Sequence, residues 1–228
     1  MDIQTRDMTF TSGQTTLAAY LARPVGDGPF PGLAVIHEAY GLTEHIRDMT
    51  RRLAAEGYVA LAADLFYGRS RVICMARFMG SLIRGQIEHF GIRDLKAALT
   101  TLAAEPGVDA ERLGAIGFCM GGGFAIAWAC TDPRLKVIAP FYGANPRPLD
   151  AVARSCPVVG SYPDPDFSTA HGRALDKALD GYEIEHDIKI YPGAKHSFMN
   201  STNPARYNAE ASADAWTRVL AFFGQHLA

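Results

Sequence analysis

One cysteine, Cys119, lies at the centre of a glycine-rich segment, residues 117–123, with the sequence Gly-Phe-Cys-Met-Gly-Gly-Gly. The pattern G-x-nucleophile-x-G is typical of a sharp turn between a strand and a helix, which exposes the central side chain. A thiolate in that position can attack a carbonyl carbon and form a thioester, and the start of the helix stabilises its negative charge. The segment therefore predicts a nucleophile for acyl transfer. A small buried cysteine in a tight turn is the alternative that the segment alone leaves open.

A histidine suited to act as a general base, His196, lies in the segment 191–198, Tyr-Pro-Gly-Ala-Lys-His-Ser-Phe. The segment ends a strand-like run, and its proline and glycine indicate a loop. An imidazole there can accept and return a proton near neutral pH. An exposed loop histidine without a role is the competing interpretation.

Two aspartates in one loop are candidates for the acid that orients this imidazole. Asp164 and Asp166 lie in the segment 161–167, Ser-Tyr-Pro-Asp-Pro-Asp-Phe, after another strand-like run. The order along the chain is then nucleophile, acid and histidine, as in hydrolases that carry their nucleophile on such a turn. Asp166 is the preferred acid and Asp164 the alternative. Asp64 precedes the nucleophile and is interpreted as a cap or turn residue.

A glutamate, Glu38, follows a further apolar run in the segment 36–41, Ile-His-Glu-Ala-Tyr-Gly. The run should form a strand beside the one that ends at the nucleophile, which gives Glu38 a plausible place in the same site. The backbone N–H groups of Ala39 and Met120 are then candidates for an oxyanion hole. A solvated loop glutamate is the competing interpretation.

Short apolar runs alternate with helical patterns through most of the chain, and these elements must position the four side chains. The expected strands are 8–10, 15–22, 32–37, 58–63, 112–117, 137–141, 157–161 and 184–191. The expected helices are 43–56, 72–82, 87–104, 120–130, 169–179 and 204–226. This order predicts a three-layer α/β fold, with helices on both faces of a mostly parallel sheet. Ligands of such sheets bind beyond the carboxyl ends of the strands, where all four candidates fall.

Length and composition are those of a soluble globular protein. The chain has 228 residues, of which 48% are hydrophobic and 20% charged, with a formal net charge of −2. The length predicts one domain over 1–228, and the charge gives no basis for binding nucleic acid or an anionic membrane. The first residues lack the pattern of a signal peptide, and no apolar run reaches the ~20 residues that a bilayer requires. We expect a cytoplasmic protein.

The four cysteines, Cys74, Cys119, Cys130 and Cys156, lie far apart in the sequence. Their spacing fits neither a zinc site nor a disulfide framework, and no histidine pair has the spacing of a helical metal site. The glycine-rich segment also lacks the Lys-Ser/Thr ending of a phosphate-binding loop. Neither a metal nor an organic cofactor is therefore expected.

Taken together, these segments resemble the dienelactone hydrolase family, which are cysteine hydrolases of the α/β-hydrolase fold. The matching segments, in chain order, are 36–42, 57–65, 117–122, 141–144 and 191–198. The resemblance implies a triad of Cys119, Asp166 and His196. It also implies that Glu38 pairs with the resting thiol, is released when substrate binds and then takes up the thiol proton. The implied reaction is hydrolysis of an ester or lactone through an acyl-thioester, with His196 activating water.

The resemblance also bears on the substrate. A family arginine that follows the histidine and binds a substrate carboxylate is replaced here by Asn200, and a neutral amide cannot make the bidentate pairing of arginine. A second family arginine falls in the segment 69–84, where the candidates are Arg71, Arg77 and Arg84. The replacement of arginine by Asn200 argues against dienelactone as the substrate, whereas another ester or lactone stays possible as the substrate. The expected substrate contacts are Tyr40, Tyr142, Arg77, Phe198 and Asn200.

Two other functions would use the same residues. One is a non-catalytic protein that binds a small ligand in the pocket of the fold, and the other is a redox protein with Cys119 as its reactive thiol. The chain keeps Cys119, His196 and Glu38, which favours an enzyme over a protein that only binds a ligand. A redox protein would need a resolving cysteine, and none lies close to Cys119 in the sequence. The expected partner is a small ester or lactone, and the expected assembly is a monomer or a small homo-oligomer.

Overall fold

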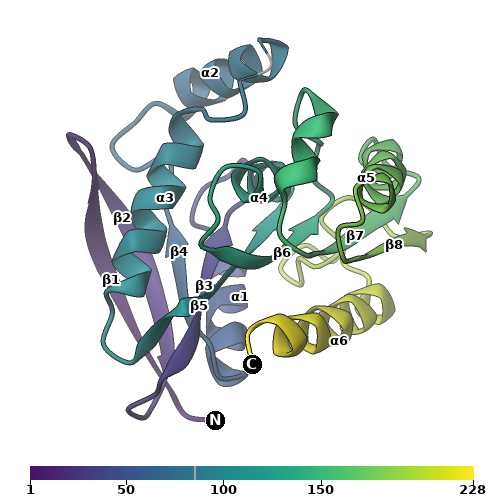
Figure 1. Ribbon diagram of the computed structural model, residues 1–228. Helices are drawn as coiled ribbons and strands as arrows, with labels where there is room; N and C mark the ends of the chain where they lie inside the picture. The colour runs from purple at the N-terminus through teal and green to yellow at the C-terminus, as the bar shows by residue number, and fades with distance from the viewer. Residues whose placement is uncertain (85) are drawn as a thin grey trace.

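One sheet runs through the middle of the molecule (Figure 1). The computed structural model describes residues 1–84 and 86–228, and within these residues the sheet has eight strands. Their order across the sheet is β1-β2-β4-β3-β5-β6-β7-β8. The strands are β1 (Ile3–Ser12), β2 (Thr15–Pro24), β3 (Phe30–Ile36), β4 (Val59–Ala63), β5 (Val108–Phe118), β6 (Leu135–Phe141), β7 (Val158–Asp164) and β8 (His186–Pro192).

The sheet is antiparallel at one edge and parallel elsewhere. β1 and β2 form a hairpin whose turn contains Gly13, with φ of 59°. β2 also pairs antiparallel with β4, whereas the pairs from β4 across to β8 are parallel. In the parallel part, Ile36 lies opposite Gly117, and Gly117 lies opposite Pro140. The carboxyl ends of β3, β5 and β6 therefore reach the same edge of the sheet.

Helices cover both faces of this sheet (Figure 1). On one face, α1 (Glu44–Ala55) and α6 (Ala209–His226) contribute to one hydrophobic core. On the other face, α3 (Phe90–Ala103), α4 (Met120–Ala129) and α5 (Thr169–Gly181) contribute to a second core. The two remaining helices are α2 (Arg71–Ile83) and the short 3-10 helix η1 (Leu149–Arg154). The predicted mostly parallel α/β architecture with covered faces is confirmed.

The helix that follows Cys119 is buried along its whole length. All residues of α4 are buried, so the helix is apolar on every side instead of being amphipathic. It packs on β5 and β6, which holds its amino end firmly at the edge of the sheet. Its 10 residues are too few to cross a bilayer, and no other helix in the described residues has the length and apolar character to do so.

Two helices begin later than predicted, because polar caps set their starts. α6 begins at Ala209, not near residue 204, and the Asn208 side chain accepts a hydrogen bond of 3.0 Å from the Ala211 N–H. α3 begins at Phe90, not at residue 87, and His89 caps it by accepting a hydrogen bond from the Gly91 N–H. In both cases the helical spacing of apolar residues extends beyond the helix, and the cap decides the boundary.

Candidate active site

Five neighbouring strands end at candidate residues. β3, β5, β6, β7 and β8 lie side by side in this order. Glu38 comes two residues after β3, Cys119 directly after β5 and Tyr142 directly after β6. Asp166 comes two residues after β7, and His196 four residues after β8. Since these strands are parallel, their carboxyl ends bring the five side chains to one edge of the sheet.

The turn at Cys119 has an unusual backbone. Cys119 has φ of 56° and ψ of −113°, a backbone conformation that residues other than glycine rarely adopt. Backbone segments approach each other closely on both sides of this turn. A Cβ on Gly117 would lie 2.1 Å from the Gly121 carbonyl oxygen, and a Cβ on Gly121 would lie 2.3 Å from the Ile36 carbonyl oxygen. The Cys119 N–H donates to the Phe141 carbonyl at 3.0 Å. The thiol is thus held between the ends of three strands, at the start of α4.

The Cys119 thiol is uncharged at neutral pH. Burial raises its pKa to about 11, and the negative charges of Glu38 and Asp166 act in the same direction. The backbone N–H groups of Met120 and Ala39 donate toward the sulfur and lower the pKa, but they do not outweigh burial. These N–H groups are the two predicted oxyanion donors, and both lie beside the atom that would bond to a substrate carbon.

His196 is paired with Asp166. Its Nδ1 lies 3.1 Å from Asp166 Oδ1, and the same oxygen accepts hydrogen bonds from the N–H and hydroxyl of Ser168 at 2.8 and 2.5 Å. Burial acts to raise the pKa of Asp166, but the hydrogen bonds from Ser168 and His196 outweigh it and lower the pKa. The carboxylate is therefore ionised. Asp164, the alternative acid, instead accepts a hydrogen bond of 3.3 Å from Arg173.

The His196 ring packs against two aromatic side chains. Its centroid lies 4.8 Å from that of Tyr142 and 4.9 Å from that of Phe167, which stacks on it at 29°. Since Asp166 accepts the Nδ1 hydrogen, Nε2 of the neutral imidazole has a free lone pair. Nε2 is buried and has no hydrogen-bond partner among the described residues. It is therefore available to accept a proton.

Glu38 is buried and bound to a serine. The Ser197 hydroxyl donates to Glu38 Oε1 at 2.7 Å, from a backbone with φ of 66°. Burial raises the pKa of Glu38, whereas the hydrogen bond from Ser197 and the positive charge of Arg206 act to lower it. A carboxylate with a raised pKa is a stronger base than an exposed one.

Two of the three predicted aromatic contacts, Tyr142 and Phe198, are fully buried. Burial raises the pKa of the Tyr142 hydroxyl, and the negative charge of Glu38 acts in the same direction. That hydroxyl has no partner in the part of the chain that the structure describes. Phe198 instead lies in the core, with its ring centroid 5.6 Å from that of Tyr142. Phe198 packs beside the Tyr142 ring, and its contact with substrate stays a prediction.

Three further side chains of interest are exposed or half-buried. Tyr40, a predicted contact, is 69% exposed. The Asn200 amide oxygen accepts hydrogen bonds from the N–H and hydroxyl of Thr202 at 3.0 and 2.7 Å, so it is engaged within its own turn. Arg206, which sequence patterns do not indicate, donates to the His196 carbonyl at 3.4 Å and acts electrostatically on Glu38.

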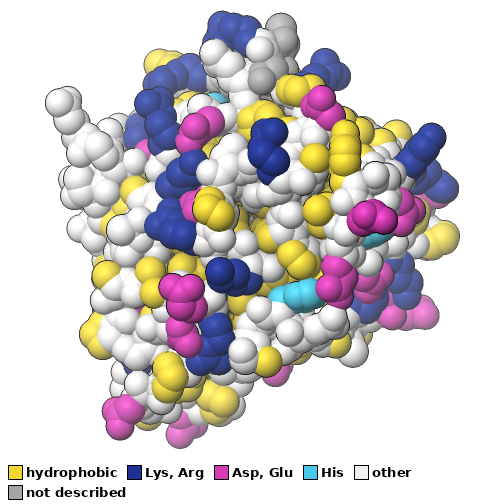
Figure 2. Space-filling model, viewed as in Figure 1, with side chains coloured by type: hydrophobic (Ala, Val, Ile, Leu, Met, Phe, Trp, Pro, Cys, Tyr) yellow, Lys and Arg dark blue, Asp and Glu magenta, His cyan; other side chains and the backbone are white. Residues whose placement is uncertain are grey.

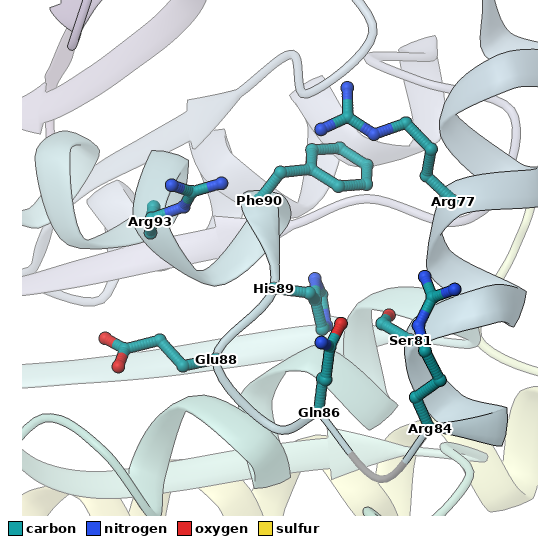
Figure 3. A pocket seen from close by; sticks show the side chains of 8 residues that line it. All are labelled: Arg77, Ser81, Arg84, Gln86, Glu88, His89, Phe90 and Arg93. Carbon is teal, nitrogen blue, oxygen red and sulfur yellow. The ribbon is translucent and has the colours of Figure 1, made fainter.

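Arg77 and Arg84 lie in a pocket between α2 and the start of α3 (Figure 3). The pocket has a volume of about 570 Å³, and none of Cys119, Asp166 and His196 is among the described residues that line it. The Arg77 guanidinium lies over the Phe90 ring, 4.9 Å from its centroid. Figure 2 shows Lys and Arg side chains gathered over this part of the molecule. The described lining of this pocket includes none of the other predicted contacts, and Arg71 is exposed at the first residue of α2.

Four residues of the site are not indicated by the sequence patterns. Ser168 and Ser197 lie one or two positions from Asp166 and His196, and a hydroxyl beside a triad residue is a usable signal because serine often bonds locally. Phe167 stacks on the His196 imidazole and Arg206 donates to the His196 backbone carbonyl; both contacts depend on the course of their loops, which no local pattern predicts. Among the described side chains, no three histidine, cysteine or carboxylate groups are arranged to hold a metal ion.

Comparison with known proteins gives matches over nearly the whole chain. The family model described as "Dienelactone hydrolase family" matches residues 17–227. A protein of Synechocystis sp. named "Putative carboxymethylenebutenolidase" is 32% identical over 249 residues, covering 100% of this chain and 99% of the relative. A protein of the same name from Escherichia coli (strain K12) is also 32% identical, covering 98% of this chain and 90% of its own.

Solved structures agree with these sequence matches. A "Putative Dienelactone Hydrolase" from Klebsiella pneumoniae is 31% identical with a TM-score of 0.86, covering 99% of this chain and 100% of its own. A dienelactone hydrolase-like promiscuous phosphotriesterase from metagenomic libraries is 27% identical with a TM-score of 0.87, covering 99% of both chains. The architecture is therefore the α/β-hydrolase fold.

Proposed function

Because this chain belongs to the dienelactone hydrolase family and is a carboxylic ester hydrolase, we propose that it cleaves an ester or lactone through a thioester on Cys119. The observation that carries the proposal is the set of groups around the thiol. Two backbone N–H groups are directed at the sulfur, and the His196–Asp166 pair leaves one imidazole nitrogen free. These are the nucleophile, oxyanion donors and base that acyl transfer requires.

The reaction begins with transfer of the thiol proton. A thiol with a pKa of about 11 is a weak nucleophile at neutral pH, so a base must remove its proton. Glu38 is the proposed base, because burial raises its pKa and its charge already acts on the thiol. Substrate that enters the site displaces Glu38 from Ser197, and the carboxylate takes the proton as the sulfur attacks.

Attack converts the substrate carbonyl to a tetrahedral oxyanion. The Ala39 and Met120 N–H groups stabilise this negative charge, as they already donate toward the sulfur. The carbon–oxygen bond to the alcohol then breaks, the leaving oxygen takes up the proton that Glu38 removed from the thiol, and the acyl group remains on Cys119 as a thioester. In a lactone, the released alcohol stays attached to the acyl chain.

Water then releases the acid. His196 Nε2 accepts a proton from water, and ionised Asp166 stabilises the imidazolium that forms. The hydroxide attacks the thioester carbonyl, the carbon–sulfur bond breaks, and the sulfur recovers a proton from the imidazolium. This step restores the neutral thiol and the neutral imidazole.

The proposed substrates are esters and lactones without a carboxylate beside the reacting carbonyl. Asn200 is neutral and its amide oxygen is bound within its own turn, which leaves no bidentate partner for a carboxylate there. The test measures turnover of small aryl esters, simple lactones and dienelactone against a buffer blank. Turnover of neutral substrates supports the proposal. Binding without turnover on the whole panel contradicts it and favours a ligand-binding protein.

The reactivity of Cys119 should depend steeply on pH. With a pKa of about 11, roughly one thiol in 10⁴ is ionised at pH 7, and the thiolate fraction rises about tenfold per pH unit. The rate of alkylation by iodoacetamide should therefore rise about tenfold per unit from pH 6 to 10 without a plateau. Labelling is followed by mass spectrometry of the peptide that contains Cys119. A rate that is already constant between pH 6 and 8 would indicate a preformed thiolate and contradict the proposed resting state.

The two loop aspartates should differ sharply in effect. Asp166→Asn removes the carboxylate that fixes the imidazole tautomer, and we expect kcat to fall by about 10²- to 10⁴-fold. Asp164→Asn is the matched control, because its carboxylate contacts Arg173 instead. We expect that variant to retain kcat within about threefold. Steady-state kinetics of both variants on one ester measures kcat. Equal losses of kcat in the two variants would contradict the assignment of Asp166 as the partner of His196.

A further inference from the structure

The imidazole of His37 is engaged on both sides by backbone groups next to the candidate oxyanion hole. His37 directly follows β3, is fully buried, and lies with its ring centroid 4.9 Å from that of Phe66. Its Nδ1 is 2.5 Å from the Glu38 carbonyl oxygen, and its Nε2 is 3.1 Å from the Leu65 backbone nitrogen.

These two contacts fix the tautomer of the ring. The Leu65 N–H can only donate, so Nε2 is the acceptor and carries no hydrogen. In a neutral imidazole the hydrogen is then on Nδ1, which donates to the Glu38 carbonyl. Burial lowers the pKa of His37, which agrees with a neutral ring.

The bond to Glu38 also sets the direction of a catalytic donor. The Glu38 carbonyl and the Ala39 N–H belong to one planar trans peptide group, so they point in opposite directions. A hydrogen bond that holds the oxygen on one side therefore directs the N–H to the other, where it donates toward Cys119. We infer that His37 is a positioning residue that aims the Ala39 N–H at the substrate oxyanion; the inference rests on the proposed function.

The hydrogen bond at Nε2 anchors the His37 ring to the loop that follows β4. Leu65 lies two residues after β4, the parallel neighbour of β3, so the imidazole joins the loops that follow two paired strands. The Glu38 carbonyl accepts a second, longer hydrogen bond of 3.3 Å from the Gly41 N–H. Without His37, this longer bond is the one that remains on the Glu38 carbonyl among the described residues. Loss of a whole oxyanion donor costs about 10²- to 10³-fold in kcat, so a tilted donor should cost about 10- to 100-fold.

The test compares two reactions of the same thiol in His37→Leu and His37→Asn. Acylation by an aryl ester passes through an oxyanion, whereas alkylation by iodoacetamide does not. The Ala39 N–H is the smallest of the influences on the pKa of Cys119, so its displacement changes the thiolate fraction little. We expect His37→Leu to slow acylation about 10- to 100-fold and alkylation less than about threefold. His37→Asn keeps an N–H at the position of Nδ1 and should recover part of the acylation rate.

His45→Leu is the matched control. His45 is also a buried histidine, but neither of its ring nitrogens has a partner among the described residues. We expect this variant to leave the ratio of acylation to alkylation unchanged. Equal loss of both reactions in the two His37 variants would show a structural role only, and no loss in either would exclude any role; both results overturn the inference. Failure of the proposed function is distinguishable, because the wild type itself would then be alkylated at Cys119 without being acylated.

Discussion

Cys119→Ala is expected to lower kcat/KM for the best neutral ester by about 10⁴-fold or more, because none of the other described candidate residues carries a thiol that could form the thioester. The backbone at this position has φ of 56°, which alanine adopts at a cost similar to that of cysteine. Folding should therefore be retained, and the loss should appear in kcat. Steady-state kinetics, with circular dichroism to follow the fold, measures the effect.

Two other cysteines serve as controls for this loss. Cys130 lies at the opposite end of α4 and donates from its sulfur to the Ile126 carbonyl, and Cys156 is a free cysteine in the same region. Burial raises the pKa of both thiols, as it does for Cys119. Cys130→Ala and Cys156→Ala should retain kcat/KM within about threefold. Activity that survives Cys119→Ala but not one of these variants would place the nucleophile elsewhere.

His196→Gln is expected to separate the two halves of the reaction. Acylation uses Glu38 as the base in the proposed mechanism, whereas hydrolysis of the thioester uses His196 Nε2. The variant should release about one alcohol per enzyme in a rapid burst and then turn over about 10³-fold more slowly than wild type. Rapid-quench kinetics with a chromogenic aryl ester measures both phases.

His186→Gln provides the control for the burst experiment. His186 is the first residue of β8, at the opposite end of that strand from His196. Its Nε2 lies 3.4 Å from an Asp176 carboxylate oxygen. This variant should keep the wild-type steady-state rate. If His196→Gln abolishes the burst together with the steady state, the imidazole acts before the thioester forms, and the assignment of Glu38 as the first base is wrong.

The architecture is predictable because several local signals agree. Short apolar runs such as 59–63 lie between glycines or prolines, and amphipathic helices such as α1 bury Ile46, Met49 and Leu53 on one side. The crossing of the chain at Gly117 and Gly121 leaves no room for a Cβ, which explains why glycines stand on either side of Cys119. Helix starts are less predictable, since apolar spacing before Ala209 continues beyond the point where Asn208 caps the helix.

The side-chain pairings of the site are predictable only in part. The strand order places Asp166 and His196 near one another, but the choice of Asp166 over Asp164 depends on how the loop turns after β7. The hydrogen bond from Ser197 to Glu38 joins residues 159 positions apart, which no local pattern contains. Phe198 has the apolar character of a pocket residue in sequence, yet it packs in the core. Whether an apolar side chain is buried in the core or lines a pocket is decided by tertiary packing.

The central claim, a thioester on Cys119, is tested most directly by trapping the acyl-enzyme. His196→Gln is mixed with a small aryl ester, quenched in acid and digested, and the peptides are analysed by mass spectrometry. The predicted result is a mass increase of one acyl group on the peptide that contains Cys119, removed by neutral hydroxylamine as a thioester is. An acyl group on another residue, or one that resists hydroxylamine, would contradict the account.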